Sequence, residues 1–188
     1  MNQLKTSTLK SVFTAVFAAL ICAGSIMAVP IGPVPIVLQN AFAVLAGLLL
    51  GPVQGAGAVG LFLIAGMIGL PVFSGGKSGF AVIAGPTGGY LAGYFIAALI
   101  GGYAVQRASK DNPKQALPII ISASIAAFAC IYIPGVLVLK RSLSLSLADA
   151  IAKGFIPFLI GDAVKIVAIV PITLKLRPIV ARYLSQDD

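Results

Sequence analysis

Asp162 and Lys165 are the residues whose types and spacing most clearly suggest chemistry. Both lie in the segment GDAVK, within an apolar stretch over 155–176 that is long enough to cross a membrane. A charged side chain placed alone in hydrocarbon costs at least about 2.5 kcal/mol, so such residues face a cavity or each other. Residues three apart also share a helix face. We therefore interpret the pair as the floor of a ligand pocket, with a purely structural ion pair as the alternative.

A second cluster of candidate residues lies at the start of another predicted helix. Gly85–Pro86 is followed by Thr87, Gly88, Gly89 and Tyr90. Proline suits the first helical position, because the N–H that it lacks would be unpaired there anyway. The N–H groups of this first turn could bind a ligand oxygen, which the two glycines would allow to approach closely. Gly88 and Gly89 could equally serve close helix packing, as small residues do in membranes.

Two further polar elements lie at the ends of neighbouring spans. The glycine-rich loop 75–79 carries Lys77 and ends at Gly79, and we expect it to act as a mobile lid. The loop has no GxxxxGK[ST] pattern, so it is not a phosphate loop. Gln39 and Asn40 place two side-chain amides near the start of the second span. We favour ligand binding for Gln39, whereas for Asn40 ligand binding and a helix–helix hydrogen bond both remain open.

These residues are embedded in a strongly apolar chain. Of its 188 residues, 59% are hydrophobic and only 10% are charged, whereas a soluble domain carries about a quarter. The apolar runs are continuous rather than alternating, which favours membrane helices over barrel strands. The sequence therefore predicts an all-α integral membrane protein with one transmembrane domain over residues 1–188. The six predicted spans cover about 8–29, 36–50, 53–69, 86–106, 115–138 and 155–176.

The distribution of basic residues predicts the orientation. Six spans place both termini on one side, and that side carries Lys5, Lys10, Arg107, Lys110, Lys114, Lys175, Arg177 and Arg182. The opposite side carries Lys77, Lys140, Arg141 and Lys153. The side with the excess of basic residues is the cytoplasmic one. We therefore expect cytoplasmic termini and outward-facing loops at 71–85 and 139–154, in a bacterial or archaeal cytoplasmic membrane.

Composition also argues against several classes of function. The chain has no histidine, which removes the commonest metal ligand and the commonest general base, so we expect no metal and no cofactor. One intramembrane carboxylate without a partner base disfavours a membrane enzyme. The net charge of +8 comes from scattered basic residues, which disfavours a nucleic-acid partner. A channel would need polar groups through its whole depth, and here the polar residues stop in the outer half.

The first span carries a separate pattern of small residues. Ala15, Ala19 and Ala23 recur at every fourth position, which allows another helix to approach closely. Packing inside the chain explains this stripe adequately. Docking to a separate membrane partner is the sharper interpretation, and both remain open.

Four motifs in order along the chain resemble the BioY family, namely PIGPVPIVLQN, GGKSGF, GPTGGYLAGY and GDAVK. BioY proteins are the biotin-specific substrate-binding subunits, or S components, of energy-coupling factor (ECF) transporters. The resemblance implies six transmembrane helices and capture of biotin from outside. It also implies a partner module with a transmembrane coupling subunit and two ATPases, which docks on the alanine stripe of the first helix.

The resemblance also places individual residues. It puts Asp162 and Lys165 in the biotin site, and the Gly85–Tyr90 turn with its preceding loop over or beside the ligand. The chemistry agrees, because the ureido N–H groups of biotin need an acceptor, its ureido oxygen needs a donor, and its carboxylate would tolerate Lys77. The alternatives are an S component for a different vitamin and a solitary, low-capacity biotin transporter.

Overall fold

The chain is built mainly from helices that run along one common direction. The computed structural model describes residues 2–30, 32–109 and 112–184; Ile31, Lys110 and the side chain of Lys5, all used above, lie outside this description. The elements are α1 (Asn2–Ala23), β1 (Ala28–Val29), β2 (Ile36–Val37), α2 (Gln39–Leu50), α3 (Pro52–Met67), η1 (Ser74–Gly76), α4 (Phe80–Ala84), α5 (Gly88–Val105), α6 (Pro113–Ser142), α7 (Leu147–Gly154), η2 (Ile156–Phe158) and α8 (Leu159–Leu184).

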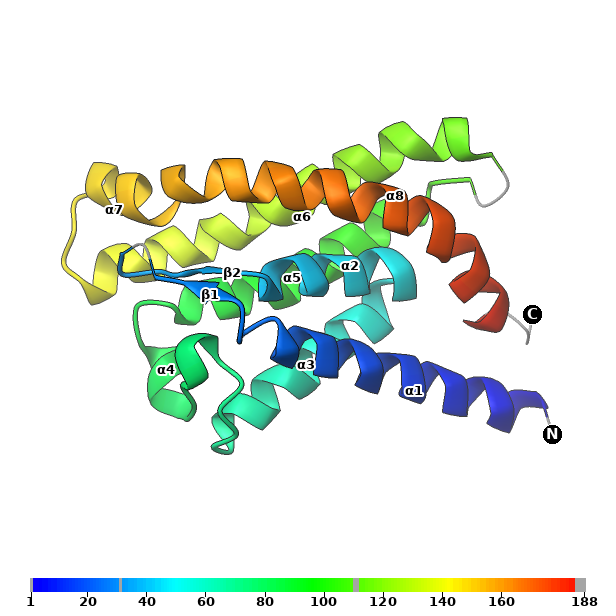
Figure 1. The fold of residues 1–188 in the computed structure, drawn as a ribbon, viewed down its shortest axis with the longest axis horizontal. Helices are drawn as coiled ribbons and strands as arrows, with labels where there is room; N and C mark the ends of the chain where they lie inside the picture. Colours follow the sequence, from blue (N-terminus) through cyan, green and yellow to red (C-terminus); the bar gives the residue numbers. More distant parts are fainter. Residues whose placement is uncertain (1, 31, 110–111, 185–188) are drawn as a thin grey trace.

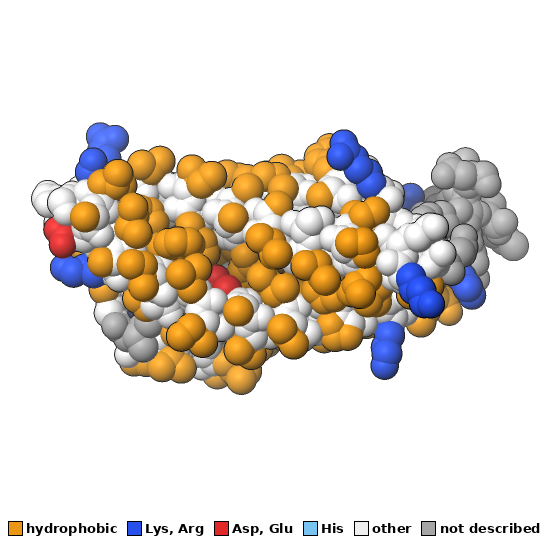
Figure 2. Space-filling model, turned by 90° about the horizontal axis from the view of Figure 1, so that it is seen from above, with side chains coloured by type: hydrophobic (Ala, Val, Ile, Leu, Met, Phe, Trp, Pro, Cys, Tyr) orange, Lys and Arg blue, Asp and Glu red, His pale blue; other side chains and the backbone are white. Residues whose placement is uncertain are grey.

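The ends of the molecule differ in structure. α1 begins and α8 ends at the same end of the bundle, as Figure 1 shows, whereas α4, α7 and the β1–β2 hairpin gather toward the other end. Hydrophobic side chains cover the middle of the elongated surface in Figure 2, and lysine and arginine side chains gather near its two ends. This distribution is that of a protein with an apolar belt in a bilayer and charged ends in water.

The helices differ in how much of a bilayer they can cross. Within the described part of the chain, three segments are long and apolar enough to span it, namely α5, α6 and the segment containing α8. The apolar part of α1 covers Ser7–Ala23, and α2 and α3 have 12 and 16 residues. At about 1.5 Å per residue, α2 rises only about 18 Å, which is less than the roughly 30 Å of hydrocarbon.

A short hairpin replaces the helix ends that the sequence predicted around the proline-rich segment. α1 ends at Ala23 rather than at residue 29, and Ala28 pairs antiparallel with Val37. Pro30, Pro33 and Pro35 lock φ and remove N–H donors, which excludes a helix interior here. The pairing satisfies backbone groups that a helix would otherwise satisfy, and it extends the short α2 toward its end of the bundle.

The later helices run further than the sequence predicted. α6 begins after Asn112, whose side chain accepts hydrogen bonds from the N–H groups of Lys114 (3.1 Å) and Gln115 (3.4 Å). It then continues through Pro134 to Ser142. The last predicted span starts with the short η2 and continues as α8 to Leu184. Neighbouring helices stabilise prolines inside such spans by satisfying the backbone groups that proline frees.

Close packing between α5 and α6 depends on Gly93. α5 has its most extensive helix contact with α6. A Cβ on Gly93 would lie 2.7 Å from the carbonyl oxygen of Ile131 and 2.8 Å from its Cα. Neither position can move without displacing the backbone of α6, so glycine is required for this approach.

We expect Gly93→Ala to lower the midpoint of thermal unfolding in detergent, because overpacking at a rigid contact costs about 1–3 kcal/mol. Gly60→Ala is the matched control, since the nearest heavy atom to a Cβ there is 3.9 Å away. The control should be neutral or stabilising, because alanine has the better helix propensity. Equal midpoints for the two variants would contradict the packing role of Gly93.

Candidate functional site

Asp162 and Lys165 lie at the centre of a buried hydrogen-bonded network. Lys165 Nζ donates to Asp162 Oδ1 at 2.9 Å, which is also the distance of their ion pair. Asn40, in the first turn of α2, bridges both residues: its Nδ2 donates to Asp162 Oδ1 at 3.1 Å and its Oδ1 accepts from Lys165 Nζ at 2.9 Å. Tyr132 of α6 donates from its hydroxyl to the second carboxylate oxygen, Asp162 Oδ2. The network therefore joins α2, α6 and α8.

Burial explains why this pair is so fully partnered. Asp162 and Lys165 are 5% and 9% exposed. A buried charge is costly unless it is paired and its remaining lone pairs and protons are satisfied. Both carboxylate oxygens accept hydrogen bonds here, and the opposite charge lies one helical turn away. The observed contacts are therefore those of a structural ion pair, and ligand binding at the pair stays a proposal.

Two members of the network were not fully predicted from the sequence. The sequence leaves a ligand-binding and a helix-packing role open for Asn40, and the structure gives it hydrogen bonds to both charges. Tyr132 was missed, because a single tyrosine in a long apolar run looks like core packing. Its ring packs edge-on against Phe155 at 4.8 Å between centroids. The chemistry of tyrosine could have indicated this role, since a buried phenol usually has a hydrogen-bond partner.

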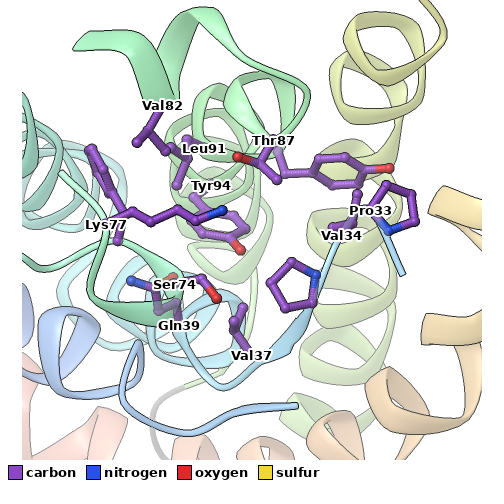
Figure 3. A pocket seen from close by; sticks show the side chains of 13 residues that line it. Pro33, Val34, Val37, Gln39, Ser74, Lys77, Val82, Thr87, Leu91 and Tyr94 are labelled. Atoms are coloured by element: carbon purple, nitrogen blue, oxygen red, sulfur yellow. The ribbon is translucent and has the colours of Figure 1, made fainter. Parts of the chain in front are cut away.

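A pocket lies next to this network, between the proline-rich segment, the 73–77 loop and α5. Its walls include the side chains of Gln39, Lys77, Thr87, Tyr90 and Tyr94. Figure 3 shows the Lys77 side chain reaching across the pocket toward Tyr94. The free volume is about 60 Å³, which is room for several waters. Binding sites for small molecules usually offer about 300–1,000 Å³, so this pocket is contracted.

A second hollow lies beside the first and shares part of its wall. Pro33, Lys77, Val82 and Thr87 line both cavities, and the second has a free volume of about 260 Å³. Lys77 is exposed and lies outside the helices. Movement of this one flexible side chain could therefore join the two spaces into one of ordinary ligand size.

The loop that carries Lys77 is anchored at both of its ends. Phe73 is 1% exposed and packs edge-on against Phe62 at 5.4 Å between ring centroids. The N–H of Phe73 donates to the carbonyl of Lys77 at 3.0 Å, which closes a tight turn through Gly75 and Gly76. Both glycines have φ near +70°, a conformation that favours glycine. Gly79 lies at the far end of the loop, where its N–H donates to the carbonyl of Gly66 at 2.7 Å.

Some residues at the start of α5 line the pocket, and others pack against neighbouring backbone. Thr87 and Tyr90 line the pocket, whereas Gly88 and Gly89 are not among its lining residues. The N–H of Gly88 donates to the carbonyl of Gly85 at 3.0 Å, and a Cβ on Gly89 would lie 2.2 Å from the carbonyl oxygen of Pro134. These contacts favour the packing interpretation for both glycines. The hydroxyl of Tyr90 donates to the carbonyl of Gly154 at 2.8 Å and so joins α5 to the end of α7.

The structure brings the predicted site residues into two adjoining groups. Gln39, Lys77, Thr87 and Tyr90 surround the pocket, and Asp162 and Lys165 lie in the buried network. The Gln39–Asn40 peptide joins the groups, because Gln39 lines the pocket while Asn40 holds the ion pair. Gln39 Nε2 also donates to the carbonyl of Val72 at 2.8 Å, which fixes the start of the loop.

Residues 2–30, 32–109 and 112–184 contain no group of three His, Cys, Asp or Glu side chains close enough to hold a metal ion. The polar groups beside the pocket are hydrogen-bond donors and acceptors that suit an uncharged polar group of an organic ligand.

The alanine stripe of α1 faces away from the rest of the chain. Ala15, Ala19 and Ala23 are exposed, while the opposite face of α1 buries Phe17 and Ile21 against the neighbouring helices. Packing inside this chain therefore does not explain the stripe. An exposed row of small residues leaves room for a helix of another molecule.

Comparison with known proteins gives consistent matches along the chain. The family model described as BioY family matches residues 1–182. The biotin transporter BioY of Thermotoga maritima is 35% identical over 162 residues, which cover 86% of this chain and 92% of the relative. The biotin transporter BioY of Rhizobium etli is 36% identical and covers 86% of this chain and 89% of the relative.

A solved structure matches the fold as a whole. The crystal structure at 2.1 Å of the S-component for biotin from an ECF-type ABC transporter superposes with a TM-score of 0.77 at 31% identity. The match covers 93% of this chain and 92% of that chain. The helical membrane architecture of an ECF S component, predicted from the sequence, is thereby confirmed.

We expect Tyr132→Phe to destabilise the protein by about 1–3 kcal/mol, because it leaves a buried carboxylate oxygen without a donor. Tyr103→Phe is the matched control: Tyr103 is 58% exposed, and surface substitutions usually stay within about 0.5 kcal/mol. Thermal unfolding in one detergent measures both variants. A loss of stability no greater for Tyr132→Phe than for the control would show that the hydroxyl contributes nothing to the network.

Proposed function

Because the chain belongs to the BioY family, we propose that it captures biotin in the pocket beside the Asp162–Lys165 pair and delivers it to an ECF energising module. Its role is that of a substrate-binding transport subunit and not of an enzyme. The solved structure with the same fold is an S component for biotin. ATP hydrolysis is then the task of partner subunits, since the sequence has no nucleotide-binding motif.

The observation that carries this proposal is the way Asn40 binds the ion pair. A carboxamide has an N–H and a C=O on one carbon, and here the N–H faces Asp162 while the C=O faces Lys165. A ureido group also carries N–H and C=O on one carbon. The ureido ring of biotin can therefore take the place of the Asn40 side chain between the two charges, with Asp162 as acceptor and Lys165 as donor.

The energetics of this exchange are favourable. Each hydrogen bond that Asp162 and Lys165 lose from Asn40 is replaced by one to the ligand, so neither buried charge is left unpaired. The N–H of Ala41, which donates to Asn40 Oδ1 at 3.0 Å, also donates to the carbonyl of Leu38 at 3.1 Å and keeps that partner. A ligand group that lacked either the donor or the acceptor would leave one charge short of a hydrogen bond, which costs roughly 1.5–3 kcal/mol and favours the ureido group.

The remaining parts of biotin fit the wider pocket. Tyr94 and Leu91 supply aromatic and apolar walls for the bicyclic ring. With the ureido group inward, the valerate carboxylate points toward Lys77 at the mouth. Withdrawal of Lys77 would join the 60 Å³ pocket to the 260 Å³ hollow beside it and admit the ligand. The loop 75–79 then acts as a lid that pivots on the buried Phe73.

The orientation of the site follows from the charge distribution. The pocket lies among elements that gather opposite the start of α1 and the end of α8 (Figure 1). Eight basic residues on the side of the termini against four on the other favour cytoplasmic termini, as argued from the sequence. Six spans in a bacterial or archaeal cytoplasmic membrane would then place the pocket on the outer side, where biotin arrives.

The exposed alanine stripe supports docking to the coupling subunit of the module. The residue after α1 also lies against the site, since a Cβ on Gly24 would lie 2.9 Å from the backbone nitrogen of Gln39. Two ATPase subunits would complete the module. A different vitamin with a cyclic urea or amide group is the second candidate ligand, because the same N–H and C=O pattern would satisfy the pair.

Asp162→Asn should weaken biotin binding at least tenfold, which corresponds to about 1.4 kcal/mol. Asn40→Ala should bind biotin as tightly as the wild type or more tightly, since it removes the group that biotin must replace. Isothermal titration calorimetry on the purified protein measures both.

Asp149→Asn is the matched control, because Asp149 is an exposed carboxylate of α7 that bonds Ser146 and does not line the pocket. If Asp162→Asn unfolds, the double variant Asp162→Asn/Lys165→Met removes both buried charges and keeps the test possible. Wild-type affinity in either Asp162 variant would exclude the pair from the site, and a tenfold loss in Asn40→Ala would contradict the exchange.

Replacing Ala15 and Ala19 together by leucine should leave biotin binding unchanged. Biotin uptake by cells that contain the module should fall at least tenfold. The bulky side chains would keep a partner helix at a distance. Ala126→Leu and Ala152→Leu, at exposed positions on α6 and α7, form the control pair. Normal uptake by the α1 variant would leave the stripe without a docking role.

A further inference from the structure

A third cavity opens on the side of the bundle, between α6 and α7. Ile133 and Leu137 of α6 and Leu147 and Ile151 of α7 form its walls, and its free volume is about 430 Å³. Ile133, Leu137 and Leu147 are 64%, 56% and 51% exposed. The groove is therefore apolar and faces the hydrocarbon of the bilayer, so a lipid chain can enter it from the side. It is separate from the ligand pocket described above, with which it shares no lining residue.

Positively charged side chains continue the groove toward the end of α6. Lys140 and Arg141 follow Leu137 by three and four residues, so they lie one turn further along the same face. Both are exposed, and Lys153 of α7 is exposed as well. The one acidic residue in this connection, Asp149, accepts a hydrogen bond from the hydroxyl of Ser146 at 2.6 Å. Three cations against one carboxylate leave this end of the groove positive.

The dimensions match one leaflet of a membrane. Ala129, at the inner end of the groove, lies twelve residues before Arg141, which is about 18 Å along the helix. Half of a hydrocarbon core is about 15 Å. An acyl chain in the groove would therefore place its phosphate at the level of Lys140 and Arg141.

We propose that the groove between α6 and α7 binds one anionic phospholipid, with an acyl chain along Ile133 and Leu137 and its phosphate at Lys140 and Arg141. The floor of the groove includes Tyr132 and Phe155, and Tyr132 holds Asp162. The bound chain thus supports the outer side of the buried network. The proposal depends on the membrane location of the protein and not on the identity of the transported ligand.

Native mass spectrometry of the purified full chain in detergent, with added phosphatidylglycerol or phosphatidylcholine, tests the proposal. We expect one tightly bound lipid and at least a threefold preference for phosphatidylglycerol. Lys140→Gln/Arg141→Gln should abolish this preference, because each basic residue near the headgroups contributes to the attraction. Lys175→Gln/Arg182→Gln, which removes two exposed cations from α8, should keep it.

A second pair of variants tests the groove itself. Ala129→Trp fills its inner end and should reduce binding of both lipids at least tenfold, whereas Ala152→Trp, exposed and outside the groove, should not. Unchanged lipid preference in the Lys140/Arg141 variant would overturn the proposal, as would lipid binding by Ala129→Trp at the wild-type level. A dimer that Ala129→Trp dissociates would also overturn it, since a second copy would then occupy the groove.

Discussion

The structure depends on one requirement, that two opposite charges inside a membrane bundle must be paired and fully hydrogen-bonded. Asp162 and Lys165 satisfy it with the help of Asn40 and Tyr132. The four side chains come from three helices that are distant in the sequence, so the network fixes how α2, α6 and α8 meet. A hydrophobic contact could tolerate a shift of these helices, whereas a buried charge that loses a partner costs several kcal/mol.

The same network would keep the proposed binding site stable before a ligand arrives. If the two buried charges had no partners, the desolvation of each charge would destabilise the site. Asn40 removes this cost by presenting, from the first turn of α2, the N–H and C=O pattern that a ureido group presents. Because Gln39 next to it lines the pocket and holds the 73–77 loop through Val72, replacement of Asn40 by a ligand and movement of the loop affect one short segment. Gly24, the residue after α1, packs closely against that segment, which would give occupancy of the proposed site a physical route to the exposed alanine stripe.

Much of this arrangement could be predicted from the sequence, and the remainder could not for physical reasons. The charge of Asp162 and Lys165 inside an apolar stretch predicts a site or an ion pair, because hydrocarbon penalises any other placement. The sequence does not show that Tyr132 partners Asp162, since that contact joins positions 30 residues apart on two helices. The packing of Gly89 against Pro134 likewise depends on the distance between α5 and α6. The hairpin at 28–37 replaced two predicted helix ends, because prolines exclude a helix but do not specify which extended pairing follows.

The central claim is that the ureido group of biotin replaces Asn40 between Asp162 and Lys165. Calorimetric titration of the wild-type protein with biotin, biotin methyl ester and 2-iminobiotin tests it most directly, because each analogue changes one end of the ligand. The account predicts tight binding of biotin, a moderate loss for the ester, and at least a hundredfold loss for 2-iminobiotin, which lacks the acceptor oxygen for Lys165. Equal affinity for biotin and 2-iminobiotin, or a larger loss for the ester than for 2-iminobiotin, would contradict it.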